Sequence, residues 1–190
     1  MKFRRPLKIT SRSSSITNSF VQAIIPTVRP TDAELGMALN ELGMTFDTRA
    51  CVYCGVSATD WDHLRPLVKG KRPTGFLNEA RNLVPSCGPC NQSKSGAYWK
   101  DWMEGNAPGS PKRRGVKDVA QRIATLAKFE EWGNLAPFPI QSAVTAEKWA
   151  AYWAALQEIQ DKMSEAQVLA DEIQRAVERK FSESRTAPSA

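Results

Sequence analysis

The chain has 190 residues and a formal net charge of +6, and 42% of its residues are hydrophobic. This composition can bury a core, which argues against a chain that is disordered throughout. The sequence contains no run of eighteen apolar residues, so we expect no membrane-spanning helix. It has a single histidine, His63, and any chemistry that needs an imidazole therefore depends on that residue.

The excess positive charge lies in the first thirty residues. They contain six Lys or Arg residues and no acid, whereas residues 31–190 carry 20 bases and 20 acids. A segment of this kind is usually a solvated arm, and in some proteins it contacts phosphate groups. No apolar stretch typical of a secretory signal precedes residue 20. We therefore expect a cytoplasmic protein with a flexible or loosely docked basic arm over residues 1–30.

A first helix is expected to begin after Thr31, which forms a capping-box pattern with Glu34, and Gly43 can end it. Residues 45–98 have poor hydrophobic periodicity, so a bound ligand can replace an apolar core there. A short helix is expected over residues 95–104. Its tryptophans, Trp99 and Trp102, are expected to pack in the core rather than to stack on nucleic-acid bases.

The C-terminal half is predicted to be helical. Gly and Pro residues mark 105–115 as a linker, and apolar spacing predicts a helix over about 116–132. Residues 145–181 place apolar residues at alternating steps of three and four, which is a heptad-like seam. The seam either packs against the body of the protein or forms a coiled-coil homodimer. Residues 182–190 are expected to be a frayed tail.

The four cysteines form two CxxC pairs, Cys51 with Cys54 and Cys87 with Cys90. Each pair can form a knuckle that presents two thiolates, and four thiolates suit one tetrahedral Zn²⁺ ion. The alternatives are two disulfides or four free thiols, and disulfides are disfavoured in a chain without a secretion signal. Four protein ligands leave no position for water, so we expect the zinc to be structural.

Further polar residues lie between and after the two pairs, in the segments Asp60–Pro66, Asn82–Ser86 and Asn91–Lys94. The order CxxC, Asp-His, Asn-Leu-Val and CxxC-Asn-x-x-Lys resembles the HNH endonuclease family of zinc-knuckle ββα-metal nucleases. The resemblance covers residues 51–96. It implies an α+β fold with a zinc-stapled ββα unit embedded among helices, to which the periodicity adds a long C-terminal helix. The expected segments are a basic arm (1–30), a nuclease domain (31–104), a linker (105–115) and a helical region (116–190).

The resemblance also implies a role for each polar residue. His63 would be the general base that activates water. Asp62 and Asn91 would hold a catalytic Mg²⁺ or Mn²⁺ ion. Asn82 would tie down the loop between the two strands, and Lys94 would reach a phosphate.

Elementary chemistry is consistent with these roles. An imidazole with a pKa near ~6.5 suits general-base work at neutral pH, and carboxylate and amide oxygens suit Mg²⁺. Neighbouring side chains of a strand point to opposite faces, so Asp62 and His63 can share a site only at a bulge or a strand end.

Asp60 is an alternative metal ligand on the same face as Asp62. Pro85 departs from the family pattern, and we expect it to shorten or bend the second strand. Each residue also has a structural alternative, such as a helix N-cap for Asn91.

A basic stretch connects the two predicted strands. Residues 65–81 contain five bases against a single acid, and the bases are Arg65, Lys69, Lys71, Arg72 and Arg81. We predict that this stretch contacts DNA phosphates, although a solvated loop is the alternative. The Lys112–Arg114 cluster and the N-terminal arm are further candidates.

The sequence therefore predicts a divalent-metal-dependent DNA endonuclease that hydrolyses phosphodiester bonds, such as a restriction or phage-encoded nuclease. By resemblance to the family, the products would be a 5′-phosphate and a 3′-hydroxyl. A homodimer through residues 145–181 would supply the second site that double-strand cleavage needs. Two alternatives stay open: a zinc DNA-binding module without catalysis, and a helical protein that recruits a partner through its seam.

Overall fold

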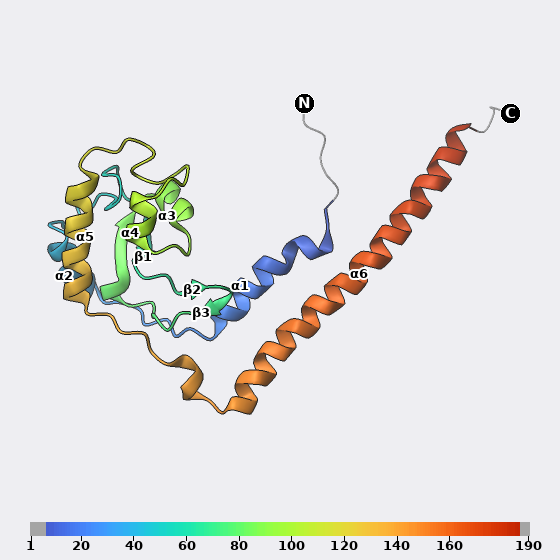
Figure 1. Ribbon diagram of the computed structural model, residues 1–190, viewed down its shortest axis with the longest axis horizontal. Coiled ribbons are helices and arrows are strands. Elements are labelled where there is room, and N and C mark those ends of the chain that lie inside the picture. The colour runs from blue at the N-terminus through green and yellow to red at the C-terminus, as the bar shows by residue number, and fades with distance from the viewer. Residues whose placement is uncertain (1–6, 187–190) are drawn as a thin grey trace. The chain divides into compact units, whose positions relative to one another are not determined.

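The computed structural model describes residues 7–186, and it divides into two compact units. One unit is Val21–Ala143, and the other combines the described parts of Met1–Phe20 and Val144–Ala190. The described chain is α+β, with six α-helices and two two-stranded sheets, which confirms the predicted class (Figure 1). None of the described helices has the length and apolar character needed to cross a membrane.

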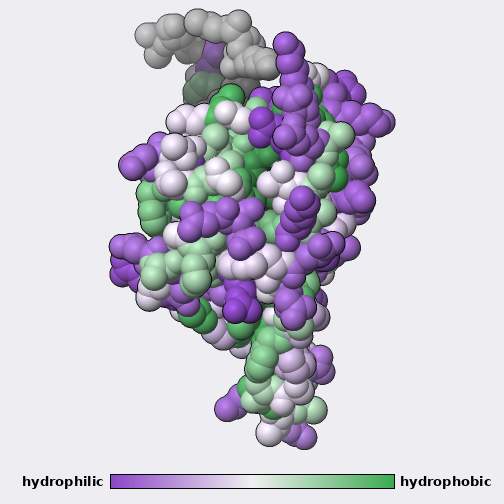
Figure 2. All heavy atoms as spheres, turned by 90° about the vertical axis from the view of Figure 1, so that its left-hand side faces the viewer, coloured by the Kyte–Doolittle hydropathy of each residue, from purple (hydrophilic) through white to green (hydrophobic). Residues whose placement is uncertain are grey.

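The larger unit begins with α2 (Asp32–Glu41), which has the predicted ends. Thr31 Oγ1 accepts a hydrogen bond from Glu34 N, and the Glu34 carboxylate accepts one from Thr31 N at 2.7 Å. After the helix, Gly43 adopts a φ of +69°, the left-handed conformation that commonly ends helices. Together with α5 (Val119–Gly133), α2 forms the side of this unit at the left of Figure 1. That side faces the viewer in Figure 2, where hydrophilic and hydrophobic residues are interspersed.

The middle of the larger unit is a hairpin followed by a helix. Strand β1 (Asp60–His63) pairs antiparallel with β4 (Leu83–Ser86), and α3 (Gly88–Lys94) follows β4 after one residue. Pro85 lies inside β4 opposite Trp61, so it does not shorten the strand. Its carbonyl accepts a hydrogen bond from Val52 N at 3.0 Å, which joins the first CxxC segment to the hairpin. The loop between β1 and β4 contains a small second hairpin, β2 (Val68–Lys69) and β3 (Arg72–Pro73), and the 3₁₀ turn η2 (Ala80–Asn82).

The core of this unit lies between the hairpin and the helices α4 (Trp99–Glu104) and α5. Trp99 and Trp102 are buried there, as predicted, and Trp102 packs edge-on against Tyr53 with 5.1 Å between ring centroids. The predicted linker 105–115 is folded against this core. Its Ser110 is fully buried and donates a hydrogen bond to the Gly105 carbonyl at 2.7 Å.

The smaller unit contains η1 (Ile9–Arg12), most of α1 (Ser13–Ala23) and the long helix α6 (Ala146–Thr186), which follows η3 (Ile140–Ala143). Gln160 donates to Thr17 Oγ1 at 2.8 Å, and Tyr152 donates to the Phe20 carbonyl at 2.9 Å. Thr17 precedes Phe20 in α1, whereas its partner Gln160 follows Tyr152 in α6. The two helices are therefore antiparallel, and α1 lies along the first half of α6. Leu156 is buried beneath this contact.

Both termini contain more helix than the sequence predicts. The N-terminal segment, expected to be a flexible or loosely docked arm over 1–30, is helical over residues 9–23, and α1 contacts α6 there. The tail predicted to fray from 182 continues as helix to Thr186. The basic residues Lys2, Arg4 and Arg5 of the arm, and residues 187–190 of the tail, lie outside the described residues.

Candidate metal centre and neighbouring polar residues

The four cysteines come together in one cluster. Their Sγ atoms all lie within 4.8 Å of one another, and the Cys54 and Cys87 sulfurs are 3.7 Å apart. A tetrahedron with Zn–S bonds of about 2.3 Å requires sulfurs about 3.8 Å apart, so the cluster has the size of a zinc site. All four cysteines are free thiols rather than disulfides. The cluster can therefore hold a structural metal such as zinc, as the spacing predicts.

Local backbone geometry forms each half of the cluster. In the first knuckle Gly55 has a φ of +81° and donates its N–H to the Cys51 carbonyl at 2.8 Å. In the second knuckle Cys87 is the N-cap of α3 and Cys90 lies in its first turn. The hydrogen bond from Cys90 lowers the pKa of Cys51 to about 5 and raises the pKa of Cys90. Hydrogen-bonded thiols of this kind lose their protons when they bind a metal cation.

Asp62 points from β1 toward α3 and is almost completely buried. Its carboxylate forms an ion pair with Lys94 Nζ at 3.1 Å and accepts a hydrogen bond from the Tyr53 hydroxyl at 2.7 Å. Burial and the nearby Asp62 charge raise the pKa of Tyr53 well above its usual value, so its hydroxyl remains a donor. A cation that binds this carboxylate would compete with the Lys94 ammonium for it.

Lys94 does not lie where its expected contact with a phosphate would put it. Its side chain is 1% exposed, and its ammonium also donates to the His63 carbonyl at 2.9 Å. A buried ammonium with these partners does not reach a DNA phosphate, so the phosphate-contacting role expected for Lys94 is corrected. Lys94 instead joins α3 to the end of β1.

His63 is the last residue of β1 and is partly buried. Its Nε2 lies 3.1 Å from Asn78 Oδ1. Burial lowers the pKa of His63 and so favours the neutral imidazole, although the Asn78 hydrogen bond opposes this effect. The continuous pairing of β1 with β4 shows no bulge at Asp62, and the two side chains therefore point to opposite faces of the strand.

The two asparagines with expected roles lie on either side of the second knuckle. Asn82 is fully buried: its Oδ1 accepts from Arg65 N at 2.7 Å, and its Nδ2 donates to the carbonyls of Arg65 and Leu77 at 3.0 Å. These bonds join the two ends of the loop between β1 and β4. Asn91 is half-buried in α3 and is not the N-cap, a position that Cys87 occupies.

The basic residues of the loop divide into two groups. Arg65 is anchored inside the unit, with Nε 2.6 Å from Glu130 Oε1 and its guanidinium 4.6 Å from the centre of the Tyr98 ring. Lys69, Lys71 and Arg72 are exposed on the β2–β3 hairpin. The hairpin therefore presents three of the predicted DNA-contacting residues on the surface, while Arg65 connects the loop to α5.

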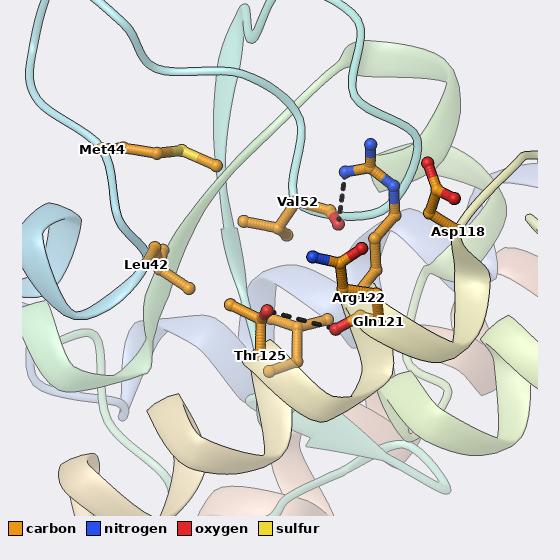
Figure 3. A pocket seen from close by; sticks show the side chains of 8 residues that line it. Leu42, Met44, Val52, Asp118, Gln121, Arg122 and Thr125 are labelled. Carbon is orange, nitrogen blue, oxygen red and sulfur yellow. Dashed lines mark hydrogen bonds between the residues drawn. The ribbon is translucent and has the colours of Figure 1, made fainter.

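The larger unit has two surface cavities. The first, of about 200 Å³, lies between α5 and the first knuckle, where Arg122 Nη1 donates to the Val52 carbonyl at 3.4 Å (Figure 3). The second, of about 260 Å³, is bordered by Phe46, Arg49 and Trp61, among others. Neither cavity is lined by His63.

Sequence reasoning missed three residues that shape the site: Tyr53, Asn78 and Glu130. Tyr53 lies inside the first CxxC pair, where a buried aromatic residue could have been noticed. Asn78 and Glu130 lie 15 and 65 positions from the residues they contact, His63 and Arg65, and no local pattern marks them.

Comparison with protein-family models, with curated proteins and with solved structures finds no match to this chain.

Proposed function

We propose that this protein is a zinc-stabilised HNH-type endonuclease that hydrolyses DNA phosphodiester bonds. One observation carries the proposal: an antiparallel hairpin and the helix after it are joined to a four-cysteine cluster, with the chain's single histidine at the end of the first strand. A hairpin followed by a helix supports the ββα unit that we propose from the sequence resemblance. A hydrogen bond to Asn78 holds the orientation of this imidazole, which is the side chain that most often serves as a general base.

In this proposal His63 is the general base. Its lowered pKa keeps the ring neutral, which is the form that can accept a proton. When Nε2 donates to Asn78 Oδ1, the lone pair on Nδ1 is available to take a proton from water. Asn78 thus positions the ring, and Asn82 holds the loop that carries Asn78.

Asp62 and Asn91 are the proposed ligands of a catalytic Mg²⁺ or Mn²⁺ ion, since carboxylate and amide oxygens suit these cations. Such an ion would polarise the phosphate and stabilise the leaving 3′ oxygen. Because the Lys94 ammonium is paired with the Asp62 carboxylate, we propose that the cation displaces this ammonium when it binds. The exposed bases Lys69, Lys71 and Arg72 are the proposed contacts to DNA phosphates.

A zinc-dependent DNA-binding module without cleavage is the second candidate. Two observations favour it. The buried ion pair of Asp62 with Lys94 neutralises the proposed cation ligand, and the side chains of Asp62 and His63 point to opposite faces of β1. Free thiols in one cluster suit a reducing compartment, so for either function we propose a cytoplasmic location. Both functions share the zinc cluster and the basic hairpin, and only cleavage requires His63.

The deciding experiment is plasmid cleavage by the zinc-loaded chain. The reaction is started by adding Mg²⁺ or Mn²⁺ rather than stopped by a chelator, because a chelator would also extract zinc. The proposal expects cleavage only with the added cation, and a loss of about 10²–10⁴-fold in His63→Ala. DNA binding without cleavage by the wild-type chain would favour the binding module, and equal cleavage by the wild type and His63→Ala would reject His63 as the general base. Circular dichroism and zinc content establish that the variant is folded.

A further inference from the structure

The segment predicted to be a linker contributes to the cysteine cluster. Arg114 lies in this segment, and its Nη1 is 3.2 Å from the Sγ atom of Cys90. We infer that Arg114 is part of the metal centre, as a charged hydrogen-bond donor to a metal-bound thiolate. The inference rests on metal binding by the cluster and not on DNA cleavage.

The contact between Arg114 and Cys90 matters because a zinc ion bound by four thiolates carries negative charge. A Zn²⁺ ion with four thiolates has a net charge of about −2, because each coordinated thiol loses its proton. Cys90 is fully buried, so water does not solvate its share of that charge. A guanidinium at hydrogen-bond distance offsets part of the charge and holds the thiolate in place.

The backbone around Arg114 is arranged to hold it there. Arg114 N donates to the carbonyl of the buried Ser110 at 3.0 Å, and Lys112 N donates to the Met103 carbonyl at 3.2 Å. Gly109 approaches Ser93 of α3 so closely that a Cβ atom would overlap with that side chain. The segment is therefore packed directly on the helix that carries Cys90, and the contact does not depend on a free surface arm.

The neighbouring Arg113 provides a matched control. It has the same charge and is also exposed, but its guanidinium lies near the carbonyl of Asn106 at 3.4 Å, away from the cluster. Removing either arginine changes the net charge equally. Only Arg114 is expected to affect the metal.

The experiment compares the wild-type chain with Arg114→Ala, Arg114→Gln and Arg113→Ala. Zinc affinity is measured by competition with a chromophoric chelator, and the sulfur-to-metal charge-transfer band is recorded after Co²⁺ substitution. We expect Arg114→Ala to weaken zinc binding by about 10–100-fold and to shift the Co²⁺ band, because outer hydrogen bonds to metal ligands have effects of this size. Arg114→Gln keeps a donor without the charge and should show an intermediate effect. Arg113→Ala should match the wild type.

Equal zinc affinity and identical Co²⁺ spectra in Arg114→Ala and Arg113→Ala would overturn the inference. A wild-type chain that binds neither zinc nor Co²⁺ would overturn both the inference and the proposed zinc site. Intact zinc binding with no DNA cleavage would reject the nuclease and leave the role of Arg114 unaffected. Far-ultraviolet circular dichroism of the metal-saturated variants separates a direct effect on the metal from a loss of fold.

Discussion

Lys94 and Asp62 form an ion pair inside the larger unit, with Nζ 3.1 Å from Oδ2 and side chains that are 1% and 6% exposed. The pair joins α3 to β1, and Lys94 also binds the carbonyl of His63. The backbone at His63 is therefore held in part by a lysine that the sequence resemblance assigns to phosphate binding. The following predictions test this arrangement and its neighbours.

Lys94→Met should destabilise the protein by about 3–5 kcal/mol, because it leaves the Asp62 carboxylate buried without a counter-charge. Urea denaturation of the zinc-loaded protein measures the change. The double variant Lys94→Met with Asp62→Asn should lose less than the sum of the single variants, since it removes both charges. A loss below about 1 kcal/mol in Lys94→Met would show that the pair is not buried in solution.

Asn82→Ala should cost about 1–3 kcal/mol, because it leaves the backbone groups of Arg65 and Leu77 without their partner. The matched control is Asn40→Ala, which removes an exposed asparagine near the end of α2. Both are measured by denaturant unfolding. Equal stability of the two variants would contradict the loop-closing geometry.

His63 should titrate below its usual pKa of about 6.5, because burial disfavours the charged ring. The sign follows from linkage: the unfolded chain binds the proton first, so stability is complete above pH 6.5 and falls as the pH drops toward the folded pKa. The single histidine gives one imidazole signal in proton NMR, recorded without added Mg²⁺ or Mn²⁺. Asn78→Ala should lower the midpoint further, since the Asn78 hydrogen bond raises this pKa. A midpoint at or above 6.5 in the wild type would refute the buried environment.

Removing the metal should unfold the region between the two knuckles, because four thiolates without an ion lose the bonds that join them. Cys87→Ser should abolish tight zinc binding and lower the thermal midpoint. Elemental analysis and thermal circular dichroism provide the measurements. In the wild type, chelation followed by added zinc should restore the original midpoint, and an unchanged midpoint after complete zinc removal would contradict a structural role.

The sequence predicts a homodimer through residues 145–181, and in that dimer the second half of α6 should mediate self-association. Residues 171–185 are all exposed, including the apolar Ile173, Val177 and Phe181. We expect Ile173→Asp with Val177→Asp to produce a monomer in light scattering, while the exposed Ala154→Asp control keeps the wild-type mass. A monomeric wild type at working concentration would remove the dimer.

Local patterns in the sequence determined several features of this protein. The CxxC spacing predicts the cysteine cluster, and the Thr31 and Glu34 pair predicts the start of α2. The apolar spacing places Trp99 and Trp102 in the core. The helix start and the buried tryptophans depend on residues a few positions apart or on a hydrophobic period. For the cysteines, local spacing relates only the two members of each pair, and the fold brings the pairs together across 33 positions.

Only the tertiary structure decided the direction of the long polar side chains. Lys94 turns inward to Asp62, 32 positions away, and Asn78 meets His63 across the loop. The N-terminal segment, read as a flexible arm, becomes a helix because α6 offers it an apolar face. A charged or amide side chain can point to solvent or to a buried partner with nearly equal local preference. Packing of distant segments selects between the two, since burying such a group costs free energy unless a partner is already in place.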